Sequence, residues 1–215
     1  MALERRTFED RESWLAWRIN GIGGSEAAAV IGESKWCSTL ELWKLKCGIE
    51  QPKDLSGVDY VQQGVRMEPV LRDYFRATHP ELTIEHHALD VLYQSERPWL
   101  FATLDGEIVR SDGQRGILEC KYSAPRGKGA WSEWTNRVPQ SYYAQVLHQL
   151  LATGYSFVYL VACLESFNGD SSFRTYLWER DDETVTGQLA WLEAREREFW
   201  SCVTERIMPP VRFAL

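Results

Sequence analysis

The chain has 215 residues, 44% of them hydrophobic and 10 of them tryptophan, which is enough to bury a full core and excludes a disordered protein. No stretch approaches the roughly 18 apolar residues that cross a bilayer, and no apolar segment follows the charged N-terminus, so we expect a cytoplasmic protein without a membrane partner. The net charge of -7 argues mildly against a general nucleic-acid binder, whose basic residues would here have to be concentrated in a channel.

The length predicts one domain that spans residues 1–215. Within it we expect an N-terminal helical part at about 1–57, a core at about 58–180, and a C-terminal helix and tail at about 181–215. The cysteines are odd in number and form no CxxC pair, which favours thiols in a reducing compartment over disulfides or a zinc site. They are Cys37, Cys47, Cys120, Cys163 and Cys202.

Sequence patterns in the N-terminal part predict three helices. Residues 7–19 have apolar positions at helical spacing, and residues 38–48 run from a Ser/Thr cap to a glycine. Between them Ser25 can cap a short helix over 26–31. The glycines just before Ser25 let backbone N–H groups approach an anion, although composition favours a tight turn before a buried helix.

A longer helix is predicted for residues 59–78 and a first strand within residues 81–94. Glu68 falls on the apolar face of that helix, where a carboxylate needs a partner. A metal ion, a water molecule or an arginine could fill this role, and the helix pattern by itself favours the arginine.

The stretch 99–122 organises the chain, because it predicts two strands joined by a turn at residues 111–114. Strand side chains alternate between faces, so Glu119 and Lys121 share one face and Cys120 takes the other. If the hairpin brings Asp105 to the same end, two carboxylates repel each other unless a cation such as Mg²⁺ or Mn²⁺ lies between them. An acid followed by E-x-K is the signature of the PD-(D/E)xK nucleases; taken alone, it also fits a solvated strand face.

The remainder predicts a loop, two helices and two strands. The glycine-rich loop 124–136 carries Arg126 and Lys128, which can reach a phosphate. The predicted helices are 140–153, with Tyr142, Gln145 and Gln149 on one face, and about 181–205; the strands are 157–163 and 172–180.

Several blocks agree in order and spacing over residues 14–165, namely WRINGIGGSEAAAVIG, ELWxxKxG, GxxxEP, TLDG, ECK and PxxYxxQxxHQL. Together they resemble the phage lambda exonuclease and YqaJ-type viral recombinase family. The resemblance implies an α/β PD-(D/E)xK restriction-endonuclease-like fold, with a mixed central β-sheet flanked by helices.

The resemblance also implies an activity. Such enzymes are Mg²⁺-dependent exonucleases, with Mn²⁺ as a substitute and two ions per site, that digest one strand of double-stranded DNA from its 5′ end. They release 5′-mononucleotides and leave a 3′ overhang for phage recombination in a bacterial host. A ring-shaped homotrimer and a single-strand annealing protein as partner are implied in the same way.

Matching the family position by position implies site residues. The metal ligands are Asp105, Glu119, the backbone carbonyl of Cys120, and Glu68 directly or through water. Lys121 and Gln145 complete the catalytic set. The receptor of the 5′-phosphate comprises Arg18, Ser25, Thr103 and, as a looser match, Arg126 or Lys128, between which the spacing does not choose.

Two alternatives stay open at this stage. An endonuclease or single-strand nuclease of the same superfamily would use the same motif on another substrate. A non-catalytic DNA-binding scaffold would keep the fold without the chemistry, although every expected acid and lysine is present.

Overall fold

The structure is a computed structural model and describes residues 2–210. Its helices are α1 (Arg11–Trp17), α2 (Ala27–Val30), α3 (Thr39–Lys46), α4 (Asp59–Thr78), α5 (Gly127–Ser132), α6 (Gln140–Thr153) and α7 (Glu183–Thr204). Its strands are β1 (Leu3–Thr7), β2 (Thr83–Glu85), β3 (Asp90–Gln94), β4 (Phe101–Ala102), β5 (Gly106–Val109), β6 (Arg115–Ser123), β7 (Phe157–Glu165) and β8 (Ser171–Glu179). Two 3₁₀ turns cover Arg18–Asn20 and Gly24–Glu26.

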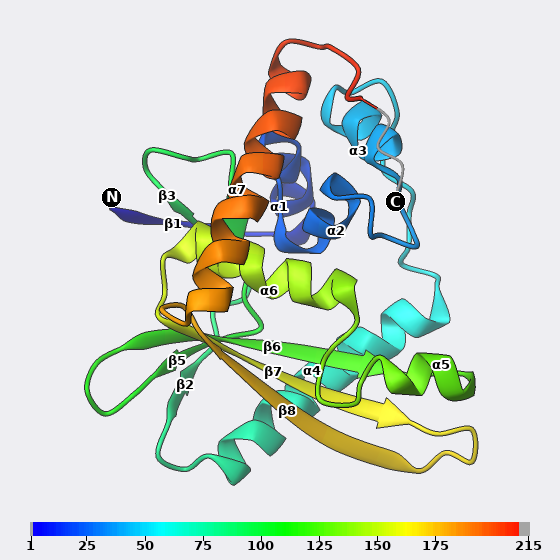
Figure 1. Cartoon of the computed structure of the whole chain (residues 1–215), viewed down its shortest axis with the longest axis vertical. Helices are drawn as coiled ribbons and strands as arrows, with labels where there is room; N and C mark the ends of the chain where they lie inside the picture. Colours follow the sequence, from blue (N-terminus) through cyan, green and yellow to red (C-terminus); the bar gives the residue numbers. More distant parts are fainter. Residues whose placement is uncertain (1, 211–215) are drawn as a thin grey trace.

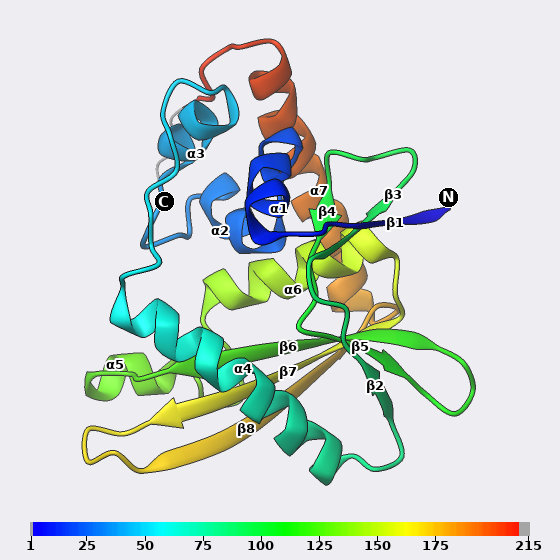
Figure 2. The ribbon, with the colours of Figure 1, turned by 180° about the vertical axis from the view of Figure 1, so that it is seen from behind.

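A mixed five-stranded sheet in the order β2-β5-β6-β7-β8 forms the centre of the molecule (Figure 1). Only β6 and β7 pair in parallel, and α6 lies within the connection between them. Helix α4 packs on one face of the sheet, while α6 and then α7 cover the other (Figures 1 and 2). Both faces are therefore buried, as the apolar run of β7 predicts.

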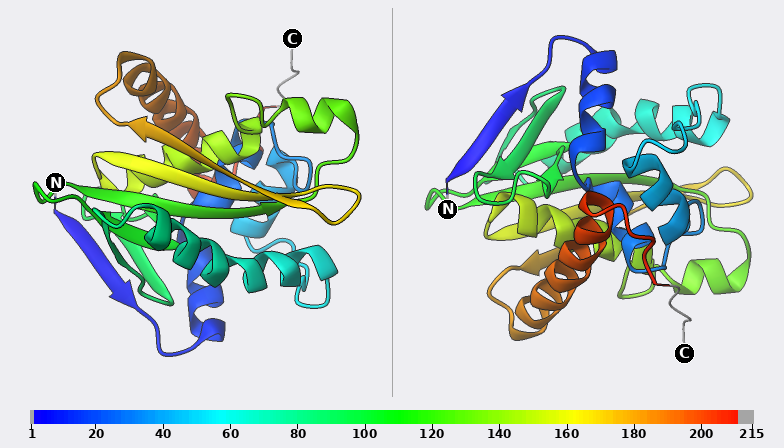
Figure 3. Two further views of the ribbon diagram at one scale, coloured as in Figure 1. Left: turned by 90° about the horizontal axis from the view of Figure 1, so that it is seen from below. Right: turned by 90° about the horizontal axis from the view of Figure 1, so that it is seen from above.

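A smaller antiparallel sheet, β1-β3-β4, lies to one side of the central sheet. Seen from above, β1 runs beside β3 next to α1, and seen from below α4 lies across the central sheet (Figure 3). Helices α1 to α3 gather on the side of α6 that faces away from the central sheet (Figure 1). The N-terminal helices are thereby placed above one end of β6.

The first strand of the hairpin predicted within residues 99–122 is broken at residues 103–105, so the prediction of one continuous strand before the turn is wrong. Phe101 and Ala102 pair with β3, and the Phe101 amide donates to the Ile22 carbonyl oxygen at 3.1 Å. Only from Gly106 onward does the chain pair with β6, and the last pair is Gly106 with Leu118. Beyond Leu118, β6 therefore lacks a β5 neighbour, and this opening positions the candidate site.

Other boundaries also differ from the predictions. Strand β1 was missed because its sequence does not alternate and its residues are exposed; it is held by pairing with β3 and by Arg5, which contacts Asp90 at 2.6 Å. Helix α1 consequently begins only at Arg11, after the Asp10 cap. The region 81–94 forms two strands in different sheets, and the predicted loop 124–136 contains α5. The helix predicted for 59–78 is confirmed to the residue.

A buried ion pair joins α6 to α7. His148 Nδ1 lies 2.6 Å from Glu196 Oε1, and His148 Nε2 lies 2.8 Å from the Phe101 carbonyl oxygen. Both side chains are fully buried. Burial opposes the imidazolium, but the charge of Glu196, its hydrogen bonds and the more distant Glu26 outweigh this effect and raise the pKa of His148.

We expect this pair to make stability pH-dependent. Because the folded-state pKa of His148 is raised, its contribution is complete below about pH 6.5 and is lost as the pH rises through the folded pKa, at up to about 1.4 kcal/mol per pH unit. The reference is the double variant His148→Gln/Glu196→Gln, which replaces both ionisable groups by neutral amide side chains of comparable size. Urea unfolding between pH 6 and 10 measures the difference; a difference that stays constant contradicts the prediction.

Candidate active site

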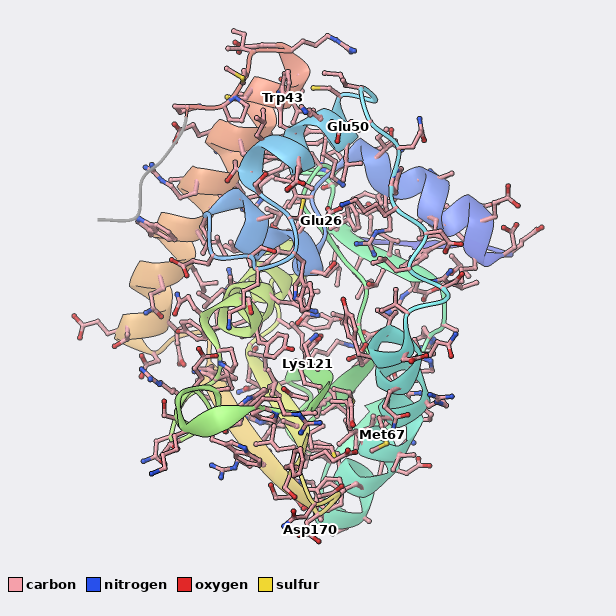
Figure 4. The ribbon with its side chains drawn as sticks, turned by 90° about the vertical axis from the view of Figure 1, so that its right-hand side faces the viewer. Glu26, Trp43, Glu50, Met67, Lys121 and Asp170 are labelled. Carbon is pink, nitrogen blue, oxygen red and sulfur yellow. The ribbon has the colours of Figure 1, made fainter. Side chains whose placement is uncertain are left out.

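A cleft of about 320 Å³ opens where β6 loses its β5 neighbour. It lies between β6, the first half of α4, the start of α6 and the 3₁₀ turn at Gly24–Glu26. In Figure 4, Lys121 lies beside α4, which carries Met67, with the segment of Glu26 above it. The candidate residues that line the cleft are Arg18, Ser25, Glu68, Thr103, Asp105, Glu119, Cys120, Lys121 and Gln145.

The acid and lysine pair of β6 shares one face, as strand alternation predicts. Lys121 Nζ lies 2.5 Å from Glu119 Oε1, while Cys120 packs into the apolar cluster under α4. Asp105, from the break between β4 and β5, accepts a hydrogen bond from the Cys120 amide at 2.7 Å. The three ionisable groups therefore meet at one edge of the sheet.

The charges of this cluster act strongly on one another. Burial, followed by the negative charges of Glu119 and Glu68, raises the pKa of Asp105 well above its usual range. Burial works against the Lys121 ammonium, but Glu119 and Asp105 outweigh it and raise the pKa of Lys121 to about 12. Lys121 is therefore a cation at neutral pH, suited to stabilising negative charge rather than to accepting a proton.

Two glutamines of α6, one turn apart, hold the Glu119 carboxylate. Gln145 donates from Nε2 to Glu119 Oε1 at 2.7 Å and accepts from Lys121 Nζ at 2.9 Å. Gln149 donates to Glu119 Oε2 at 2.6 Å and is 1% exposed. Helical spacing predicts that both lie on one helix face, but Gln149 was not among the predicted site residues; its spacing of four from Gln145 was the available signal.

Glu68 lines the cleft and is paired with an arginine, as its position on the apolar helix face predicted. Arg72 donates from Nη1 to Glu68 Oε1 at 2.9 Å and to the Asp105 carbonyl oxygen at 2.6 Å. Arg72 is 8% exposed and was not singled out from the sequence, although it follows Glu68 by four residues. It connects α4 to the chain break that carries Asp105.

The donor chemistry of the cluster fits a hard divalent cation. The N–H and C=O of one strand residue point to the same side, so the Cys120 carbonyl faces the side on which its amide contacts Asp105. Two carboxylates and a carbonyl oxygen are ligands that Mg²⁺ and Mn²⁺ accept. Among residues 2–210 no three His, Cys, Asp or Glu side chains lie close enough to hold an ion, but Mg²⁺ commonly uses one or two carboxylates plus water.

A second group of side chains lies at the upper wall of the cleft. Arg18 donates from Nη2 to Ser25 Oγ at 3.2 Å, and its guanidinium lies 4.9 Å from the Trp14 ring centroid. Thr103 lines the same cleft. Contrary to expectation, Ser25 caps no helix: it lies within the 3₁₀ turn, and Glu26 occupies the N-cap position of α2.

The structure does not bring Arg126 and Lys128 into this cleft. Both are exposed at the start of α5, which Figure 1 places beyond the end of β6. The Arg126 guanidinium instead lies 6.0 Å from the ring centroid of Phe167, in the turn between β7 and β8. Because β6 continues straight to Ser123, the chain that follows is carried past the site.

A family model described as a YqaJ-like viral recombinase domain matches residues 13–156, from α1 to the end of α6 and beyond. The chain belongs to this family. It is 30% identical over 199 residues to the uncharacterized protein YqaJ of Bacillus subtilis (strain 168), a match that covers 93% of this chain and 58% of that protein. The chain thus spans little more than half the length of this YqaJ relative.

Solved structures share the fold of this YqaJ-family chain. An alkaline exonuclease (LHK-Exo) from Laribacter hongkongensis is 20% identical, with a TM-score of 0.67 and coverage of 91% of this chain and 94% of that one. A phage-related exonuclease from Haemophilus somnus 129PT is 14% identical, with a TM-score of 0.56 and coverage of 86% and 96%. The PD-(D/E)xK fold expected from the sequence is confirmed. Within residues 2–210 no helix is long and apolar enough to cross a membrane.

Proposed function

We propose that the chain is a divalent-metal-dependent exonuclease that digests one strand of duplex DNA from its 5′ end. It would release 5′-mononucleotides and leave a 3′ overhang. One observation carries the proposal: a single cleft contains the Asp105–Glu119–Lys121 cluster together with Arg18 and Ser25. The cluster suits phosphodiester hydrolysis, and a cation beside a hydroxyl suits the extra charge of a terminal phosphate.

The fold supports the same reading. The chain belongs to a viral recombinase family, and the two similar structures are those of exonucleases. A hydrolase for phosphodiester bonds must provide a nucleophile at neutral pH and must offset negative charge in the in-line transition state. The carboxylates of Asp105 and Glu119 and the ammonium of Lys121, at the end of β6, suit both requirements.

In this proposal Asp105, Glu119 and the Cys120 carbonyl hold Mg²⁺, for which Mn²⁺ can substitute. Glu68 contributes directly or through water, and we propose two ions per site. When bound, such ions lower the pKa of coordinated water and neutralise charge on the phosphate. Gln145 and Gln149 hold Glu119 in place through its two carboxylate oxygens.

The remaining roles follow from charge and position. Lys121, held protonated by its acidic neighbours, stabilises the negative charge that develops on the scissile phosphate. Arg18, Ser25 and Thr103 receive the 5′-terminal phosphate and so place the first phosphodiester bond over the cluster. Each cut creates a new terminal phosphate, which draws the strand forward by one nucleotide.

We extend the proposal to a ring-shaped homotrimer and to a single-strand annealing protein as the partner in phage-type recombination. A ring would also reconcile the net charge of -7 with DNA binding, because an acidic outer surface can surround a basic channel. Sedimentation of the purified protein with and without duplex DNA tests the assembly.

The topology of the substrate separates this proposal from its alternatives. With Mg²⁺ present, we expect linear duplex DNA to be degraded to mononucleotides and covalently closed circular duplex to survive, because an exonuclease needs an end. The control is Asp105→Asn on both substrates. Conversion of the closed circle to nicked or linear forms would indicate an endonuclease, and faster digestion of single strands would indicate a single-strand nuclease. If neither the linear nor the circular DNA is degraded, the result would favour the non-catalytic scaffold.

A further inference from the structure

Lys46 is a buried lysine for which the proposed chemistry has no use, although it is the lysine of the ELWxxKxG block. It is the last residue of α3, and its side chain is only 4% exposed. Lysine is almost never buried this deeply without a partner. The burial of the Lys46 side chain therefore indicates that its charge or its hydrogen bonds are needed at this place in the fold.

Its ammonium joins the two ends of the segment 18–26. Lys46 Nζ donates to the Arg18 carbonyl oxygen at 2.8 Å and lies 2.8 Å from Glu26 Oε2. The same Glu26 oxygen accepts the Gly23 amide at 2.8 Å. Figure 4 shows Glu26 between α3, which carries Trp43, and the strand that carries Lys121.

The middle of this segment is anchored independently. The Ile22 amide donates to the Trp99 carbonyl oxygen at 2.7 Å, and a Cβ at Gly21 would lie 2.3 Å from that same oxygen. Because these contacts fix the middle of the segment against Trp99, only its two ends need further contacts to hold their positions. Those ends carry Arg18 and Ser25, which contact each other at 3.2 Å.

Lys46 also balances a charge next to this pocket. Glu26 directly follows Ser25, so its carboxylate, if unpaired, would repel a phosphate bound at the Ser25 hydroxyl. The ion pair with Lys46 offsets that charge and leaves the positive charge of Arg18 to act on the ligand.

We propose that Lys46 is a positioning residue of the terminal-phosphate pocket, and that it acts by clamping the segment 18–26 and neutralising Glu26. This inference rests on the proposed function, since it concerns how that site selects phosphomonoester ends of DNA. It assigns a role to the α3 block of the sequence, which lies outside the acidic cluster.

The test compares duplexes of one sequence that carry a 5′-phosphate or a 5′-hydroxyl. We expect Lys46→Met to lower the ratio of their kcat/KM values by about tenfold or more, because displacement of Arg18 acts mainly on the binding of the terminal phosphate. The rate on 5′-hydroxyl ends should fall by less. The matched control is Lys44→Met, on the same helix, where Lys44 pairs with Glu50 near the surface; it should leave the ratio unchanged.

Further variants distinguish a loss of folding from a loss of the proposed role of Lys46. If thermal melts show that Lys46→Met does not fold, the test uses the double variant Glu26→Gln/Lys46→Met, which removes both charges of the pair and should lower the ratio too. An unchanged ratio in the folded variant overturns the inference. If Arg18→Ala loses the preference while Lys46→Met retains it, only the role of Lys46 fails. A wild-type ratio of one overturns both the pocket and the role of Lys46, and the test with circular DNA then still decides the nuclease.

Discussion

Lys121→Met is expected to lower the rate of duplex digestion by about a thousandfold, because it removes the ammonium group that contacts Glu119 at the end of β6. Methionine keeps most of the volume and the unbranched shape, so the loss reports charge rather than packing. The measurement is single-turnover digestion of a 5′-phosphorylated duplex at saturating Mg²⁺. The ratio between 5′-phosphoryl and 5′-hydroxyl ends should stay as in the wild type.

Two controls make this result interpretable. Lys44→Met removes a lysine outside the cleft and should change the rate by less than about twofold. A thermal melt of Lys121→Met should show a cooperative transition, which separates lost chemistry from lost folding. Retention of a tenth of the wild-type rate by Lys121→Met would remove Lys121 from the proposed mechanism.

Asp105→Asn should act in opposite directions on activity and on stability. Asp105 lies close to two other carboxylates, and the amide relieves that repulsion while its oxygen can still accept the Cys120 amide. We therefore expect a higher melting temperature without divalent ions, by about 2–4 °C for each kcal/mol of repulsion relieved. Activity should fall by about a thousandfold or more, because a proposed metal ligand is lost.

The melting temperature in the presence of added divalent ions is a second measurement on Asp105→Asn. Mn²⁺ or Mg²⁺ should raise the melting temperature of the wild type through binding to the folded state, and Asp105→Asn should lose most of this increase. Asp73→Asn, an exposed residue of α4 paired with Arg76, is the matched control and should behave as the wild type. A wild type that divalent ions do not stabilise would instead support a non-catalytic scaffold.

These two variants probe a site whose parts were not equally visible in the sequence. Local periodicity predicted that Glu119 and Lys121 share a face, because strand side chains alternate, and the structure places them 2.5 Å apart. In the same way helical spacing placed Gln145 and Gln149 on one face of α6, and both contact Glu119. Contacts of this kind depend on neighbours within one element.

Tertiary pairing accounts for what the sequence missed. The break at Thr103–Asp105 arises because β4 pairs with β3 and Ile22 while β5 pairs with β6, and no local pattern distinguishes these partners. The role of Arg72 depends on that break, since Arg72 donates to the carbonyl oxygen of Asp105 there. Arg126 was misplaced for a similar reason: only the length of β6 shows that the following chain passes the site.

The sequence by itself therefore determined the helices with clear caps or periodicity, the faces of β6 and α6, and the residue types of the acidic cluster. The tertiary structure decided which of these residues meet. Ser25, and Arg18 through its contact with Ser25, line the same cleft as the cluster. The 3₁₀ turn Gly24–Glu26 packs on α6 so closely that a Cβ at Gly24 would lie 3.3 Å from the side chains of Gln145 and Gln149. Such an approach depends on the shapes of two elements far apart in the chain, and a pattern within either element cannot encode it.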